Sequence, residues 1–232
     1  MKKIFVLTIL FGLALSAKTQ NTVLQELATY KITPEVLTMT FNEDWPNVSF
    51  ERHSVSTSPG SDFVYKQVAT YDASKPDGEK WTLVSVNDKT PEKFYIKDFR
   101  EDMNPKKKKS TLLIDEATLK IVKDDDATLL VSFKFIKNSI HHNYSYLADC
   151  TSTATISKNA GKLQKLEIIN DGPTKLETLK ISYVKFDIDY TFNTAIGQYT
   201  ITRTELNNTG SYLGATASNK TVREYTNFVK LN

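Results

Sequence analysis

Cysteine and histidine are scarce in this sequence, whose 232 residues include one cysteine and three histidines. A single thiol cannot form a disulfide within the chain. Cys150 also lies too far along the chain to be the lipid-bearing first residue of a mature bacterial lipoprotein. It shares one side of the alternating segment 148–156 with small apolar residues, which favours a buried small hydrophobe over a reactive thiol.

The sequence contains none of the short spacings that commonly hold a metal ion. The patterns HxH, HExxH and CxxC are all absent. His141 and His142 are adjacent, and adjacent residues on a strand point to opposite faces, so the two cannot easily share one ion. The triplet Asp124-Asp-Asp126 lacks the glycine and the distal glutamate of an EF-hand loop and is expected to form a polar hairpin turn. We therefore expect no metal and no cofactor.

Catalytic motifs are absent as well. Neither a Gly-x-Ser-x-Gly elbow nor a glycine-rich phosphate loop occurs. Asp187 and Asp189 would lie about 7 Å apart on one face of a strand, a separation that paired carboxylates use in glycoside hydrolysis. Lys185 beside them instead favours a solvated charged face. The sequence therefore predicts a protein that is not an enzyme.

The first 20 residues have the composition of a cleaved signal peptide. Lys2 and Lys3 precede an apolar run, Ile4–Ala14, and small residues follow at Ser16 and Ala17. Because the run is too short to cross a bilayer comfortably, we expect cleavage, no membrane-spanning segment, and a periplasmic or secreted protein. The expected organisation is a signal peptide at 1–20 and a single domain at 21–232.

Charge gives no sign of a nucleic-acid partner. The 30 basic residues include Lys2, Lys3 and Lys18, and no acidic residue lies among the first 20. Removing that segment leaves 27 basic and 27 acidic residues. A chain without net positive charge lacks the electrostatic attraction that nucleic-acid binding needs. The run Lys106–Lys109 is interpreted as a solvated loop, with a docking patch for an acidic partner as the alternative.

Hydrophobic alternation is strongest in the segment Leu179–Phe192. From Val184 onward every second residue is apolar and the residues between them are polar, as in a strand with one buried face. Leu179, Ile181 and Tyr183 alternate in the opposite phase. Such a phase change predicts a β-bulge or a sharp bend, and bulges curve sheets. The segment therefore predicts a large, curved antiparallel sheet with one apolar face.

Capping signals predict two short helices, and apolar alternation predicts about ten strands in meander order. One helix begins at Thr22 and ends near Tyr30, and the other begins at Thr90-Pro-Glu92 and ends before Pro105. The expected fold class is mainly antiparallel β (α+β), with the helices covering the concave face of the sheet. A turn at Asn207–Gly210 is expected near the C-terminus. The apolar segments from which these strands are expected to form are 48–57, 63–71, 81–86, 112–114, 119–123, 129–135, 148–157, 163–170, 179–192, 199–205, 212–218 and 222–229.

Two segments resemble the LolA-like group of periplasmic proteins, which includes the lipoprotein carrier and related outer-membrane lipoprotein-sorting-type proteins. One is Gly78–Pro91, where a Gly-x-x-Trp-x-Leu strand runs into a helix that begins with Thr-Pro. The other runs from Gly197 through Thr209-Gly-Ser-Tyr-Leu-Gly214 to Tyr225-Thr-Asn-Phe228. The resemblance implies an unclosed half-barrel sheet, lined with hydrophobic residues and lidded by helices, that holds acyl chains or lipoprotein anchors and performs no chemistry.

The resemblance has two departures. Asp88 stands where the group has glycine, and no arginine can be matched to the one that latches the lid of the lipoprotein carrier. The resemblance therefore implies a general role with apolar ligands rather than lipoprotein delivery itself.

Six apolar side chains are candidates for contact with such a ligand, and they are Phe133, Phe135, Phe186, Ile188, Tyr190 and Phe192. A filled core and a core with a ligand cavity both fit them. The predicted function is an exported, non-enzymatic binder or carrier of an apolar small molecule, a lipid or acyl chain, in the cell envelope. The alternative is a structural or interaction subunit of an envelope complex, which would have a filled core, an envelope protein as partner and no ligand.

Overall fold

The computed structural model of the chain describes residues 23–33, 36–37, 45–103, 112–140, 142–176 and 178–231. The expected signal peptide at 1–20, the lysine run Lys106–Lys109 and His141 lie outside these residues. Within the described ranges, no helix is both long enough and apolar enough to cross a membrane.

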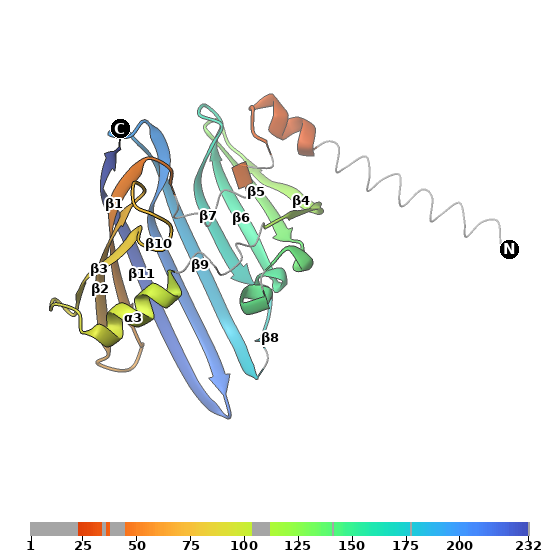
Figure 1. Cartoon of the computed structure of the whole chain (residues 1–232). Helices are drawn as coiled ribbons and strands as arrows, with labels where there is room; N and C mark the ends of the chain where they lie inside the picture. The colour runs from red at the N-terminus through yellow and green to blue at the C-terminus, as the bar shows by residue number, and fades with distance from the viewer. Residues whose placement is uncertain are drawn as a thin grey trace.

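One antiparallel sheet of eleven strands forms the body of the protein (Figure 1). The order across it is β3-β2-β1-β11-β10-β9-β7-β6-β5-β4, and β8 pairs with β9 beside this path. Most neighbours in the sheet are neighbours in sequence, as the expected meander requires, but β1 pairs with β11 from the other end of the chain. The strands are β1 (Val48–Thr57), β2 (Val64–Asp72), β3 (Trp81–Val86), β4 (Ile114–Asp124), β5 (Thr128–Phe135), β6 (Cys150–Ser157), β7 (Lys162–Asn170), β8 (Thr174–Leu176), β9 (Leu179–Asn193), β10 (Gln198–Tyr212) and β11 (Ala215–Lys230).

The sheet curves without closing, and β3 and β4 form its two edges (Figure 1). Apolar side chains that alternate along the strands meet in one large buried cluster, which includes Phe50 on β1, Leu166 on β7 and Ile188 on β9. We call the side of the sheet that carries this cluster the concave face, and the other side the convex face. The expected fold class, mainly antiparallel β with an open half-barrel sheet, is confirmed.

Short helices lie against the sheet where capping signals predict them. Residues 23–29 are helical, and Val23 and Leu27, one turn apart, are both buried. Helix α3 (Lys93–Asp102) buries Phe99 against a second, smaller cluster formed by β2 and β3. Two 3-10 helices, which the sequence analysis does not predict, connect β5 to β6; they are η2 (Lys137–Ser139) and η3 (His142–Asp149).

The phase change in β9 is a β-bulge at Ser182. On β10, Thr209 pairs with Tyr183 and the next residue, Gly210, pairs with Ile181, so Ser182 is the extra residue. The bulge puts Ile181 and Val184 on the same side of the sheet, which is why the sequence alternates in two phases, whereas Tyr183, paired with Thr209, points to the other side.

The side chain of Asn170 completes the hydrogen bonding beside this bulge. Its Oδ1 accepts a hydrogen bond from the backbone N–H of Val184 at 2.8 Å, and its Nδ2 donates to the backbone oxygen of Ser182 at 3.3 Å. β7 ends at this asparagine, so its amide group continues the ladder where the backbone of β7 no longer does.

The last hairpin corrects the sequence prediction. The turn expected at Asn207–Gly210 is wrong, because β10 continues through these residues and the chain reverses at Leu213 and Gly214. Residues 215–218 of the segment expected at 212–218 form one strand, β11, together with the segment expected at 222–229. Asparagine, threonine and glycine favour turns locally, but pairing with β9 on one side and β11 on the other satisfies their backbone groups in a strand. We call residues 207–219 the hairpin extension.

Candidate functional site on the concave face

Five of the six side chains predicted to contact a ligand lie together on the concave face. Phe133 and Phe135 are on β5, with ring centroids 5.4 Å apart in an edge-to-face arrangement. Phe186, Ile188 and Tyr190 are on β9. The β5 pair and Ile188 belong to the buried cluster, and Phe186 and Tyr190 are partly buried against it. Burial raises the pKa of the Tyr190 hydroxyl above its usual range, so this group stays neutral.

Phe192 is not brought together with the other five. Its side chain is 48% exposed and its ring contacts Tyr199, with centroids 5.5 Å apart. β7 pairs with β9 only over the segment from Lys185 to Asp189, so Phe192 lies beyond the part of β9 that this neighbour covers. Alternation alone does not reveal where a neighbouring strand ends.

Side chains from residues 23–33 and 36–37 fill part of the concave face. Leu27, Ile32 and Leu37 are almost completely buried in the same cluster as Ile188. The β6–β7 turn lies close to this segment, because a Cβ on Gly161 would be 3.3 Å from the backbone oxygen of Tyr30. Gly161 has a positive φ of 59°, so glycine suits both the turn and the close approach. The half of the face formed by β5, β6 and β7 is therefore packed.

An aromatic group lines the other half of the concave face. Phe50 lies at its centre, with its ring centroid 4.9 Å from those of Trp45 and Tyr71 and 5.5 Å from that of Phe228. Some members are buried, whereas Trp45, Trp81 and Phe228 are only partly so. The group therefore combines a packed interior with an accessible margin, and its members are Trp45, Phe50, Tyr71, Trp81, Tyr225 and Phe228.

A second bulge turns two members of this group to the same face. Tyr225 and Phe228 are three residues apart and would point to opposite faces of a regular strand. Between Ser49 and Glu51 of β1 the partner on β11 shifts from Val229 to Thr226, and Asn227 has a φ of 55°. Asparagine adopts this left-handed conformation more readily than most residues. The asparagine between two aromatic residues is the signal from which sequence reasoning could have placed this bulge.

A buried arginine connects the aromatic group to α3. The side chain of Arg52 is 2% exposed, and its guanidinium carbon lies 4.4 Å from the ring centroid of Trp81 and 5.8 Å from that of Phe99. Its Nη1 lies 3.9 Å from the sulfur of Met103, which follows α3. A cation over aromatic faces is attracted by their negative centres. Arg52 thus holds α3 against β1 and β3, a role that its position in the strand pattern does not indicate.

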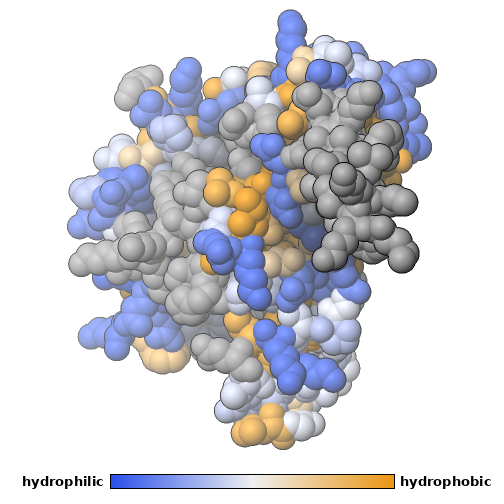
Figure 2. All heavy atoms as spheres, turned by 90° about the vertical axis from the view of Figure 1, so that its right-hand side faces the viewer, coloured by the Kyte–Doolittle hydropathy of each residue, from blue (hydrophilic) through white to orange (hydrophobic). Residues whose placement is uncertain are grey.

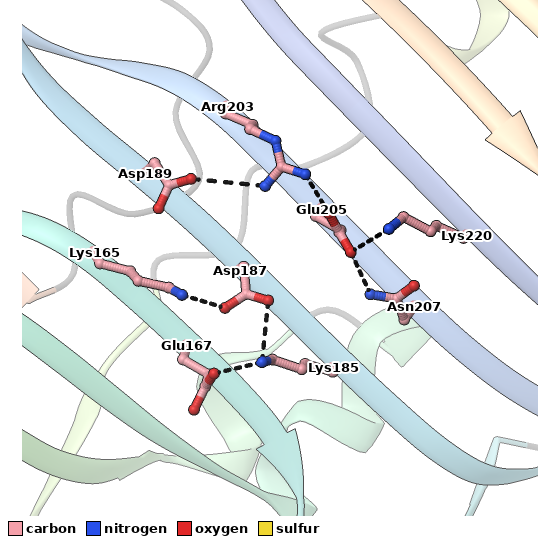
Figure 3. A network of polar contacts seen from close by, with 9 residues as sticks. All are labelled: Lys165, Glu167, Lys185, Asp187, Asp189, Arg203, Glu205, Asn207 and Lys220. Carbon is pink, nitrogen blue, oxygen red and sulfur yellow. Dashed lines mark hydrogen bonds and ion pairs between the residues drawn. The ribbon is translucent and has the colours of Figure 1, made fainter.

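The convex face carries a ladder of ion pairs (Figure 3). Asp187 lies 3.0 Å from the Nζ of Lys165 and 3.4 Å from that of Lys185. Because the side chains from β7 and β9 cover it, Asp187 is only 8% exposed, and the expectation of a solvated face is wrong for this residue. Asp189 lies 3.8 Å from a guanidinium nitrogen of Arg203. Both carboxylates are therefore engaged by basic groups, which favours a structural role for them over a hydrolytic one.

Glu205 is the most strongly perturbed acid of this ladder, which makes stability depend on pH. Lys220 at 2.7 Å, Asn207 at 2.9 Å and Arg203 lower the pKa of its carboxyl group to about 2. A carboxyl group whose pKa is lowered by folding stabilises the fold above its unfolded pKa, and the contribution disappears as the pH falls through the folded pKa.

We expect the free energy of unfolding of the wild-type protein to fall between about pH 5 and pH 2. In Glu205→Gln this decrease should be smaller by about 1 kcal/mol, after allowance for solvent screening. Urea denaturation at a series of pH values measures the difference. Glu116→Gln, an exposed position on β4, is the matched control and should keep the wild-type profile. Parallel profiles for Glu205→Gln and wild type would contradict the assignment.

Cys150 and the β4–β5 turn agree with the sequence predictions. Cys150 is completely buried, its Sγ lies 3.3 Å from the backbone oxygen of Tyr146, and burial raises its pKa to about 12, so the thiol is inert. Asp124 ends β4 at the expected hairpin turn and forms an ion pair with Lys158. The Nζ of Lys158 also lies over the ring of Tyr30, which ties the turn to the segment after the first helix.

Comparison with known proteins gives two solved structures of low sequence identity. A LolA superfamily protein from Nitrosomonas europaea is 11% identical, with a TM-score of 0.42 over 90% of this chain and 93% of that one. A DUF1329 family protein from Desulfovibrio piger is also 11% identical, with a TM-score of 0.32 over 92% of each chain. No family model and no curated protein matches the chain. The first structure belongs to the superfamily that the sequence resembles, but both scores are too low to support a functional argument.

Proposed function

We propose that this protein is an exported, non-enzymatic binder or carrier of an apolar ligand, a lipid or acyl chain, which it holds on the concave face. The proposal includes a signal peptide at 1–20, one domain at 21–232 and a periplasmic or secreted location. It is based on the apolar and aromatic side chains that line the concave face.

The partly buried aromatic side chains of the concave face support the proposal most directly. Trp45, Trp81 and Phe228 on one half, and Phe186 and Tyr190 on β9, all pack against one apolar cluster and keep part of their surface accessible. Apolar and aromatic linings with few polar groups are typical of sites for small apolar molecules.

The alternative, an interaction subunit with a filled core, also has an observation in its favour. Phe133 and Ile188, two of the predicted ligand contacts, are almost completely buried and share a cluster with Leu27 and Ile32. We therefore propose that the ligand contacts the accessible margin of the aromatic group and, on β9, Phe186 and Tyr190. The fully buried residues pack beneath these side chains and hold them in place.

A fluorescent fatty acid can test this assignment, and Phe186 and Phe192 provide a matched pair of variants on one strand. Phe186 is one of the partly buried β9 residues assigned to the ligand, whereas Phe192 lies outside the cluster. We expect saturable binding by wild type and binding about tenfold weaker for Phe186→Ser, because an aromatic contact worth about 1.5 kcal/mol or more is lost. Phe192→Ser should bind as wild type does, and circular dichroism should show that both variants are folded.

Two results would contradict the proposal. Wild-type protein that shows no saturable binding would favour the filled-core alternative. Equal loss of binding in both variants would place the ligand elsewhere.

A further inference from the structure

The β10–β11 hairpin ends in an exposed apolar apex. Leu213 is 86% exposed and Tyr212 is 53% exposed. Leu213 and Gly214 have φ values of 48° and 84°, as in a type I′ turn, whose first central position favours asparagine, aspartate or glycine. A leucine here is conformationally unfavourable and buries little of its side chain in the fold. Its presence therefore calls for a reason outside the fold.

This apex extends beyond the rest of the sheet. β1 pairs with β11 only as far as Lys220, and β7 pairs with β9 only as far as Lys185. The hairpin extension continues past both points, with the N-terminal part of β9 beside it. Figure 1 shows these long strands projecting from the lower end of the molecule, and Figure 2 shows hydrophobic atoms at that end.

Strand register gives the extension one cationic side and one apolar side. Directly paired residues of antiparallel strands point to the same side of a sheet. Lys180 on β9 pairs with Lys175 on β8 and with Ser211 on β10. Leu179 precedes Lys180 and Tyr212 follows Ser211, so both point to the other side. The apolar side is continuous with the concave face, because Tyr212 lies on the same side of β10 as Leu206, which pairs with Phe186.

Two lysines beside the extension face each other across β8 and β9, and Glu177, which lies between them in sequence, is outside the described residues. Like charges directly opposite each other destabilise a sheet. Within the described part of the chain, no carboxylate forms an ion pair with Lys175 or Lys180. The sequence between Glu205 and Glu224 also contains no acidic residue. An anionic surface beside the extension would relieve the repulsion.

We propose that the hairpin extension docks onto an anionic lipid membrane surface. Leu213 enters the outer part of the acyl region, Tyr212 lies at the boundary with the headgroups, and Lys175 and Lys180 contact lipid phosphates. Amphipathic aromatic side chains favour this boundary, and lysines near it are attracted by anionic lipids. An acidic protein partner would account for the lysines but not for a leucine at the most exposed position. Docking does not require a ligand on the concave face, so it is separate from the function proposed above.

Vesicle flotation with the protein purified after export tests this proposal. The probes are phosphatidylcholine vesicles and vesicles in which one third of the lipid is phosphatidylglycerol. We expect wild type to float with the anionic vesicles, and Leu213→Asn to bind them about tenfold more weakly, as the loss of a buried leucine predicts. Asparagine suits a positive φ, so this variant should be folded at least as well as wild type. Lys175→Gln/Lys180→Gln should lose the preference for anionic over neutral vesicles.

Val122→Asn is the matched control, because Val122 is another exposed apolar residue, on β4 at the edge of the sheet. It should bind vesicles as wild type does. Wild type that floats with neither kind of vesicle would overturn the proposal and favour a protein partner. So would Leu213→Asn that binds as well as wild type, or Val122→Asn that is equally impaired. The fatty-acid titration tests ligand binding on the concave face, and its outcome does not affect the conclusion about membrane docking.

Discussion

Replacing Arg52 by alanine is expected to lower the free energy of unfolding by about 3 kcal/mol and to release α3 from the sheet. The substitution removes an almost completely buried side chain together with its contacts to Trp81, Phe99 and Met103. The expected loss combines a cavity beneath α3 with the cation–aromatic attraction. Urea denaturation measures the free energy, and hydrogen exchange of the α3 amides reports whether the helix separates.

Two control variants separate the causes of this effect. Arg52→Lys keeps the charge but loses the planar group that stacks on Trp81, so it should be intermediate. Arg100→Ala removes an exposed arginine from α3 itself and should change stability by less than about 0.5 kcal/mol. An Arg52→Ala protein as stable as Arg100→Ala would show that the buried arginine does not hold α3.

Replacing Ile188 by tryptophan is expected to destabilise the protein by about 1–3 kcal/mol, because the added atoms have no free space to enter. Ile188 is 1% exposed and pairs with Leu166, and both belong to the cluster that Leu27 covers. Phe192→Trp, on the same strand but exposed, should be close to neutral. Denaturation curves of both variants check the difference. A neutral Ile188→Trp would mean that this part of the concave face is open.

The sequence analysis succeeded where a local pattern determines local structure. Strict alternation placed β9, and its phase change at Tyr183-Val184 predicted a bulge or a bend, which the structure has as a bulge at the neighbouring Ser182. A threonine-proline start placed α3, and a threonine followed by apolar residues at helical spacing placed the first helix. These features depend on a few neighbouring residues, which is why the sequence shows them directly.

The features that escaped prediction depend on contacts between distant segments. The pairing of β1 with β11 decides that Phe50 and Phe228 meet, and nothing within either strand indicates its partner. The turn signal at Asn207–Gly210 is real locally, but two neighbouring strands override it. Asp187 is buried because lysines of β7 and β9 cover it, which alternation cannot show. The candidate site therefore combines a predicted strand with an aromatic group that only the tertiary fold brings together.

Analysis of what the native protein carries tests the central claim, that the concave face holds an apolar ligand, most directly. The protein would be exported, purified without detergent and extracted, and its acyl lipids quantified by mass spectrometry against protein concentration. We predict an acyl lipid in near-stoichiometric amount, reduced in Phe186→Ser but not in Phe192→Ser. Lipid-free wild-type protein that also binds no fatty-acid probe would contradict the claim.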